Sequence, residues 1–364
     1  MRGRTTIALA LLVALSGCGS DDDTPVPGGD EPSASPSTPT SSEPTGGTID
    51  APAAVEATTN LLDWRDTGVR AGIRYIKGPE WEALGSEDGS TVELSSDGAG
   101  TGIDAGAGRT ISELLMSEDW AVVVRQDTAE TDPSEVDVVD LATGQQAALA
   151  GPVPASGGSW ALTGGDLYYP TYGDGGAYCL ATSALADSNG EDGWCAPRRT
   201  GFSGLTASEH GVGIMTFDDA RPACRTVNLL EAGVPQPLEG PTDCLAWDVA
   251  ATADGALWSE VPKPRRQEEA TFRASADGAY VDLGPGLTGS AVPCGDSVFF
   301  VRDPQGPDEP ARLMRWTPDH ALEVAYESRS TGDAFLGEPA CGGGVLTLSS
   351  YGDQGDESVW APVT

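Results

Sequence analysis

The feature that most limits the fold of this chain is an internal repeat with a period of about 44 residues. In each repeat a polar turn precedes a short apolar run, and these runs begin at Trp81, Trp120, Leu167, Val212, Ala256, Ser297 and Val345. A second series of strand-like runs keeps the same register and begins at Thr91, Val136, Ala177, Ala223, Ala270, Ala311 and Glu357. Because the two series stay in step over most of the chain, they predict one repetitive domain.

Further candidate strands lie between these markers, such as Trp160–Leu162 before one run and Tyr280–Leu283 after another. Four short strands in each repeat of this length are typical of an all-β β-propeller. The many turns of such a fold suit a chain with 48 Gly and 27 Pro. We expect seven blades, with six as the alternative because the first repeat, around Trp81, is weak.

The two ends of the repeat region suggest how the ring closes. The last repeat stops at Thr364, directly after its third strand-like run. An unpaired sheet edge promotes aggregation, so the missing outer strand must come from elsewhere. We expect it from the segment Asn60–Trp64, which precedes the first repeat, and therefore predict a ring closed by an N-terminal strand.

The N-terminus has the features of an export signal. Arg2 and Arg4 precede an apolar stretch from Ile7 to Leu15, which is too short to cross a bilayer. The residues Leu15-Ser16-Gly17-Cys18 follow, and they resemble the lipobox of bacterial lipoproteins. The resemblance implies cleavage before Cys18 and a diacylglycerol on its thiol. It also implies a protein that is lipid-anchored at the extracytoplasmic face of the cell membrane.

The chain accordingly divides into three parts. Residues 1–17 are expected to be the signal peptide and residues 18–57 a disordered tether. The tether is dominated by Ser, Thr, Pro, Gly and acidic residues, which cannot bury enough apolar surface to offset the entropy of ordering. Residues 58–364 are expected to form the propeller.

Six cysteines remain once Cys18 is assigned to the lipid, and an even number in an exported domain predicts disulfides. Cys179 and Cys195 fall on the third and fourth strands of one repeat, so a bridge across this hairpin is expected. The remaining pairs are less constrained: matching positions in adjacent repeats favour Cys294 with Cys341, which leaves Cys224 with Cys244. The chain has no Cys-x-x-Cys motif, so no structural zinc site is expected.

The charge of the chain excludes some partners. The formal net charge is −36, from 56 acidic and 20 basic residues. Such a surface repels phosphate backbones, so we expect no nucleic-acid partner. The residues Gly98, Gly100 and Gly102 lack the spacing and the following helix of a dinucleotide fingerprint, so no such cofactor is expected.

Local turn motifs add a resemblance to TolB-like and WD-repeat propellers. The segments Ala253-Asp254-Gly255 and Ser275-Ala276-Asp277-Gly278 are similar to the Ser-Pro-Asp-Gly turn of TolB-like repeats, although both lack the proline. TolB also has an additional N-terminal α/β domain, whereas here a tether is expected. The resemblance therefore implies a fold for residues 60–364 and does not carry over the envelope role of TolB.

No catalytic motif stands out. The two histidines, His210 and His320, both lie in turns between expected strands, and the chain has no Gly-x-Ser-x-Gly elbow. Acidic turns are frequent, but none has the spacing of a calcium loop, and we expect no metal site. Trp258 follows a turn that is close to a sialidase turn without matching it, and we interpret this residue as packing between blades.

These observations leave more than one function open. We expect a non-catalytic binding or scaffolding propeller with a cell-envelope protein or a glycan as partner. The alternative is an extracytoplasmic carbohydrate-active hydrolase or lyase with carboxylates in the propeller funnel, and a ligand sensor is a third possibility. A small basic loop with Lys263, Arg265 and Arg266 is either solvated or a contact for an acidic partner.

Overall fold

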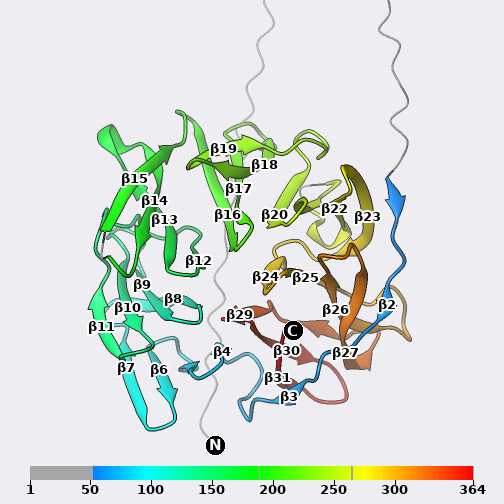
Figure 1. Ribbon diagram of the computed structural model, residues 1–364, viewed down its shortest axis with the longest axis horizontal. Helices are drawn as coiled ribbons and strands as arrows, with labels where there is room; N and C mark the ends of the chain where they lie inside the picture. Colours follow the sequence, from blue (N-terminus) through cyan, green and yellow to red (C-terminus); the bar gives the residue numbers. More distant parts are fainter. Residues whose placement is uncertain (1–51, 188, 264, 364) are drawn as a thin grey trace, which may run out of the picture. The chain divides into compact units, whose positions relative to one another are not determined.

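Short strands surround a central channel in this protein, whose computed structural model describes residues 52–187, 189–263 and 265–363 (Figure 1). The fold is an all-β β-propeller, as the repeat predicts. The expected signal peptide, Cys18 and the tether up to residue 51 lie outside the described residues. Within the described part of the chain, no helix is long and apolar enough to cross a membrane.

Both series of runs found in the sequence are strands. The first series supplies the second strand of each repeat: β5 (Glu82–Gly85), β9 (Trp120–Asp127), β13 (Asp166–Tyr172), β17 (Gly211–Asp218), β21 (Gly255–Glu260), β25 (Ser297–Arg302) and β30 (Val345–Tyr351). The second series supplies the third strand: β6 (Thr91–Ser96), β10 (Glu135–Asp140), β14 (Tyr178–Ala184), β18 (Arg225–Glu231), β22 (Ala270–Ala276), β26 (Pro310–Trp316) and β31 (Glu357–Pro362).

An inner strand precedes each of these pairs and lies toward the channel. The inner strands are β4 (Tyr75–Lys77), β8 (Arg109–Met116), β12 (Ala161–Thr163), β16 (Thr200–Ser208), β20 (Ala246–Thr252), β24 (Val292–Cys294) and β29 (Ala340–Gly342). The outer strands are β7 (Ala99–Asp104), β11 (Gln145–Ala148), β15 (Asn189–Cys195), β19 (Val234–Pro237), β23 (Ala279–Gly286) and β27 (Leu322–Thr331). Two single-turn helices, η1 (Asp174–Gly176) and η2 (Gln267–Glu269), lie in loops.

The pairing of these strands corrects the expected number of blades. Five sheets are separate blades: β4–β7, β12–β15, β16–β19, β20–β23 and β24–β27. The remaining strands form one nine-stranded sheet, in which β8–β11 join β29–β31. The seven separate blades expected from the repeat, and the alternative of six, are therefore wrong.

The reason for the merged sheet is a close approach of inner strands. β29 and β8 pair in parallel through Gly342 and Met116. A side chain at Gly342 would place its Cβ 2.6 Å from the carbonyl oxygen of Lys77 on β4. Glycine thus lets β29 come close to β4. Because β4 has only three residues, it does not separate β29 from β8, and these two strands pair with each other.

The N-terminal segment of the domain runs along the outer edges of three sheets. β1 (Ala53–Ala54) pairs in parallel with β23, and β2 (Thr58–Thr59) pairs in parallel with β27. β3 (Arg65–Asp66) pairs in antiparallel fashion with β31 and so takes the outer position in the last repeat. The segment Asn60–Trp64, expected to be the closing strand, forms no strand itself; β3 begins directly after it. The indole Nε1 of Trp64 donates a hydrogen bond of 2.7 Å to the carbonyl oxygen of Ala325.

The hydrophobic core lies between neighbouring sheets. Residues 121–124 of β9 are fully buried, because one face of this strand packs on each neighbouring sheet. This explains why the second strands are continuous apolar runs rather than alternating ones. Trp258 is fully buried between the sheets of β16–β19 and β20–β23, as expected from the sequence, and contacts Tyr280 edge to face at 5.3 Å.

Three disulfides connect the six cysteines in the pairs that the sequence favours. Cys179 and Cys195 join β14 to β15 within one sheet. Cys294 and Cys341 join the inner strands β24 and β29 of two different sheets. The third disulfide joins Cys224, before β18, to Cys244, before β20, and so also connects two sheets.

Candidate ligand-binding site in the central channel

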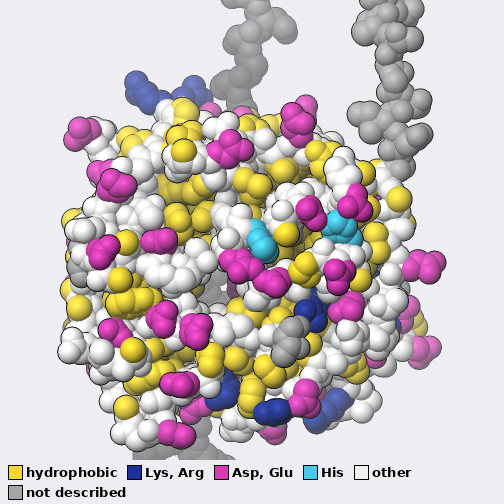
Figure 2. Space-filling view, viewed as in Figure 1, with side chains coloured by type: hydrophobic (Ala, Val, Ile, Leu, Met, Phe, Trp, Pro, Cys, Tyr) yellow, Lys and Arg dark blue, Asp and Glu magenta, His cyan; other side chains and the backbone are white. Residues whose placement is uncertain are grey.

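The inner strands surround a cavity of about 470 Å³. Its wall is formed by residues of β4, β8, β12, β16, β24 and β29, by residues directly before β4, β12, β24 and β29, and by residues of β30 and β31. A cavity of this size can hold a small ligand. Figure 2 shows the central hollow with acidic side chains around it on the viewed face.

Three charged side chains line this cavity, and they come from distant parts of the sequence. Arg74 directly precedes β4, Glu113 lies in β8, and Glu338 lies just before β29. The Nη1 of Arg74 donates a hydrogen bond of 3.0 Å to the carbonyl oxygen of Ile111, which connects the two inner strands β4 and β8. None of these residues was singled out in the sequence.

A local irregularity positions Glu113. The pairing of β8 with β9 shifts its register between Ile111 and Glu113, so Ser112 is the additional residue of a β-bulge. A bulge changes the direction of the following side chains, and bulges are frequent next to binding sites. The sequence analysis did not use the one available signal for this site, which is an acidic residue inside the run from Ile111 to Met116.

The wall of the cavity disfavours the ionised form of both glutamates. Burial raises the pKa of Glu113, the positive charge of Arg74 partly offsets this, and the charge of Glu338 adds to the rise. Burial also raises the pKa of Glu338, with a partial offset from Arg74 and a further rise from Asp248. The side chain of Glu338 reaches the solvent of the channel, but the surrounding wall still limits its hydration.

Asp248 lies behind this wall on β20 and is almost completely buried. Burial raises its pKa, whereas hydrogen bonds from the Ser259 hydroxyl and the Gly289 backbone N–H lower it. The carboxylate thereby ties the loop before β24 to β20. Because its hydrogen bonds are internal, Asp248 contributes charge to the site rather than a direct ligand contact.

Aromatic side chains complete the wall. Trp160 is 6% exposed and stacks on Tyr169 with 5.2 Å between ring centroids. Its indole Nε1 has no hydrogen-bond partner among the described residues. Tyr351 also lines the cavity and stacks on Phe335, which is 52% exposed. The cavity therefore combines carboxylates, one guanidinium and aromatic surface.

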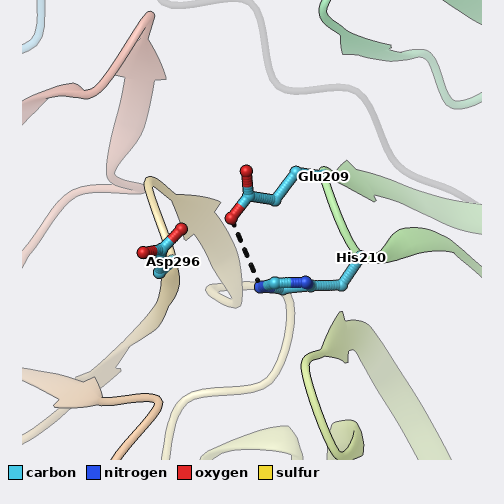
Figure 3. Close-up of side chains that lie close together, drawn as sticks. All are labelled: Glu209, His210 and Asp296. Carbon is cyan, nitrogen blue, oxygen red and sulfur yellow. Dashed lines mark ion pairs between the residues drawn. The ribbon is translucent and has the colours of Figure 1, made fainter.

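A second group of polar side chains lies at the other end of the channel. Figure 3 shows these side chains close together. Glu209 and His210 form the turn after β16, and Asp296 lies in the turn after β24. These turns follow the ends of inner strands, whereas Arg74 and Glu338 precede the beginnings of β4 and β29, so the two groups lie at opposite ends of inner strands. Nε2 of His210 lies 3.5 Å from Oε1 of Glu209. A hydrogen bond with Asp296 raises the pKa of Glu209.

These three side chains could hold a metal ion, because one ligand atom from each lies within 4.8 Å of the others. Sequence reasoning had no basis for grouping them, since Asp296 is far from the other two in the chain. All three are exposed, and exposed acidic groups commonly lie together without an ion. The arrangement alone therefore leaves the prediction that the protein has no metal site untested.

The second histidine connects two sheets on the same side of the molecule. His320 lies in the turn between β26 and β27, and its Nε2 is 2.7 Å from Oδ2 of Asp254. Its ring stacks on Trp316. Both histidines thus lie in turns, as the sequence analysis expected, and His320 has contacts that account for its position without catalysis.

The small basic loop lies between β21 and β22. Lys263, Arg265 and Arg266 are all exposed. Arg266 forms an ion pair with Glu269, which raises the pKa of the guanidinium further. For Lys263 and Arg265 no ion pair is present in the described part of the chain. A contact of this loop with an acidic partner stays a prediction. Lipidation of Cys18 also stays a prediction, because this residue lies outside the described residues.

No protein-family model matches this chain, and no curated protein matches its sequence. The structure is similar to the β-propeller domain of the Trilobed protease from Pyrococcus furiosus, which has an open velcro topology. The two are 13% identical with a TM-score of 0.55, over 80% of this chain and 96% of that one. Prolyl oligopeptidase B from Galerina marginata is 10% identical with a TM-score of 0.53, over 80% of this chain and 49% of that one.

A prolyl endopeptidase is also similar, with 14% identity, a TM-score of 0.52 and coverage of 82% of this chain and 47% of that one. The chain therefore spans about half the length of the two prolyl peptidases. TolB from Acinetobacter baumannii is among the similar structures at 13% identity, with a TM-score of 0.42 and coverage of 69% and 64%. At such identities the likeness shows the β-propeller fold and nothing about activity.

Proposed function

We propose that this protein is a membrane-anchored extracytoplasmic lipoprotein whose propeller binds a ligand in the central channel without catalysing a reaction. The observation that carries the binding function is the cavity of about 470 Å³ with Arg74, Glu113 and Glu338 in its wall. Charged side chains are costly to crowd together in a confined space, so their presence in the wall needs a reason beyond folding. Binding a polar ligand supplies that reason.

The membrane anchor is supported by the lipobox that ends at Cys18. It is tested by producing the full chain in a bacterium and measuring the mass of the membrane-associated protein. We expect a diacylglycerol on Cys18 and loss of membrane association in the Cys18→Ala variant. An unlipidated protein with normal export would contradict the anchor and leave the binding function standing.

The binding function is tested by titrating the purified full-length protein with a panel of short peptides, amines and envelope glycans and measuring heat and melting temperature. A ligand of the channel raises the melting temperature of the wild type because it binds the folded state alone. A replacement inside the cavity, Ala207→Trp, should abolish that rise without unfolding the protein. If the panel includes a binder that Ala207→Trp does not affect, the ligand binds elsewhere and the channel proposal is wrong.

A second candidate function has its own supporting observation. Burial raises the pKa values of Glu113 and Glu338, and a raised pKa is what a carboxyl group needs to act as a general acid. This favours the alternative of a carbohydrate-active hydrolase or lyase in the propeller funnel. Turnover of a glycan by the wild type and loss of turnover in Glu113→Gln and Glu338→Gln would establish it. Absence of turnover over a broad glycan panel would exclude it.

A further inference from the structure

The charges in the wall of the cavity do not balance. Among the described residues that line it, Arg74 is the one basic side chain, and it faces the two carboxylates of Glu113 and Glu338. One hydrogen bond of Arg74 is already used by the carbonyl oxygen of Ile111. One guanidinium therefore serves two carboxylates, and a negative charge stays uncompensated inside the channel.

The surroundings of the cavity increase this excess. The charged groups that act on Glu113 are Arg74 and Glu338, and those that act on Glu338 are Arg74 and Asp248. Asp248 is buried behind the wall and adds a third carboxylate on this side of the channel. The protein as a whole also has a net charge of −36 and attracts cations toward its surface.

We infer that the channel binds its ligand through a positively charged amino or guanidino group that lies between Glu113 and Glu338. The inference rests on the proposed binding function and names the chemical class of the ligand. An ammonium or guanidinium group donates charge-assisted hydrogen bonds to carboxylates. The apolar part of the ligand then contacts the wall beyond Glu113, where Leu114, Met116 and Val292 line the cavity.

An organic cation fits this site better than a bare metal ion does. Among the described residues, one group of three or more ligating side chains has donor atoms close enough together for a metal ion. This group is Glu209, His210 and Asp296, at the other end of the channel. Glu113 and Glu338 belong to no such group. Two carboxylates with aromatic and apolar surface beside them suit an organic cation, because its charged group binds the carboxylates and its carbon skeleton contacts the apolar surface.

Binding of a cation should be coupled to protons. Because the pKa values of Glu113 and Glu338 are raised, acidification protonates both groups earlier than ordinary glutamates. A bound cation favours the ionised carboxylates and lowers their pKa values again. We therefore expect proton release on binding and an affinity that falls as the pH is lowered.

The experiment is isothermal titration calorimetry with the purified full-length protein. The probes are the blocked tripeptide Gly-Lys-Gly, the same tripeptide with an acetylated lysine, and the diamine cadaverine. We expect at least one of the two cationic probes to bind and the acetylated one to bind at least about tenfold more weakly, since a charge-assisted contact is lost. The peptide and the diamine distinguish a peptide ligand from a free amine.

Two matched variants locate the site. The double variant Glu113→Gln/Glu338→Gln keeps the shape of the cavity and should lower the affinity for the cationic probe by about tenfold or more. Glu118→Gln removes an exposed carboxylate in the turn after β8, at the other end of the channel, and should leave the affinity unchanged. Binding heats of the wild type in two buffers with different ionisation enthalpies report proton release without any variant.

Other results would overturn the inference. Equal binding of the lysine and acetyl-lysine peptides would show that charge is not recognised, and the binding function would survive. Calcium binding that depends on Glu113 and Glu338, with no binding of either amine, would assign the carboxylates to a metal. Binding of neutral glycans alone, blocked by Ala207→Trp, would retain the channel as the site and reject the cationic ligand.

Discussion

The disulfide between Cys294 and Cys341 should contribute more to stability than the one between Cys179 and Cys195. A disulfide acts mainly by restricting the unfolded chain, and the effect grows with the length of the closed loop. The sequence separations are 47 and 16 residues. Loop-closure entropy then gives about 4 kcal/mol for the longer loop and about 3 kcal/mol for the shorter one at 25 °C.

The folded structure supports the same order. Cys179 and Cys195 face each other on two strands that are already paired, whereas Cys294 and Cys341 connect two different sheets. Cys294 and Cys179 are both buried, with 2% and 0% exposed, so each replacement also removes packing and the expected difference comes from the cross-link.

The assay is urea denaturation of the oxidised wild type and of two double alanine variants, one for each disulfide. We expect the free energy of unfolding to fall by about 4 kcal/mol without Cys294–Cys341 and by about 3 kcal/mol without Cys179–Cys195. The slope against urea should rise in both variants, more for the longer loop, because the unfolded chain exposes more surface. A larger loss for Cys179–Cys195, or slopes that do not change, would refute the argument from the unfolded state.

Four further substitutions test individual side chains. Glu113→Gln should raise the melting temperature at pH 8 and change it little at about pH 4. The reason is that a carboxyl group with a raised pKa contributes stability at low pH, and this stability is lost as the pH rises through that pKa. An equal effect at both pH values would exclude the buried charge as the cause. Trp64→Phe should cost about 1 kcal/mol in urea denaturation, since it removes the hydrogen bond to Ala325. Asp248→Ala should cost about 1–3 kcal/mol, because the fully buried Ser259 hydroxyl loses its acceptor, and Asp248→Asn should cost less.

The period of the sequence predicted the strands well and the sheets less well. Second strands such as β9 are buried on both faces, so selection for apolar residues marks them clearly in the chain. Inner strands such as β4 have only three residues and leave almost no pattern. The merging of β8 with β29 depends on one close approach at Gly342, and a single glycine in a chain with 48 of them gives no warning of it.

The disulfides were predictable for a related reason. Cys179 and Cys195 could be placed by counting strands within one repeat, and Cys294 and Cys341 by their equal positions in two repeats. The candidate site had no such regularity. Arg74, Glu113 and Glu338 occupy different positions relative to their inner strands, and a bulge redirects Glu113. Their meeting is a result of the ring, which brings the inner strands of distant repeats to one channel.

The position of a charged residue relative to its inner strand decides what its charge can do. Carboxylates that follow an inner strand, such as Glu118 and Asp254, lie in exposed turns where water and salt screen them. Glu113 lies within an inner strand and is half-buried, and Glu338 lies before one, where the wall of the cavity raises its pKa although its side chain reaches the solvent of the channel. Raising the salt concentration should therefore weaken cation binding at the turns strongly and binding between Glu113 and Glu338 much less. A cationic ligand whose affinity is lost at about 0.5 M salt would be held by the surface rather than by the channel.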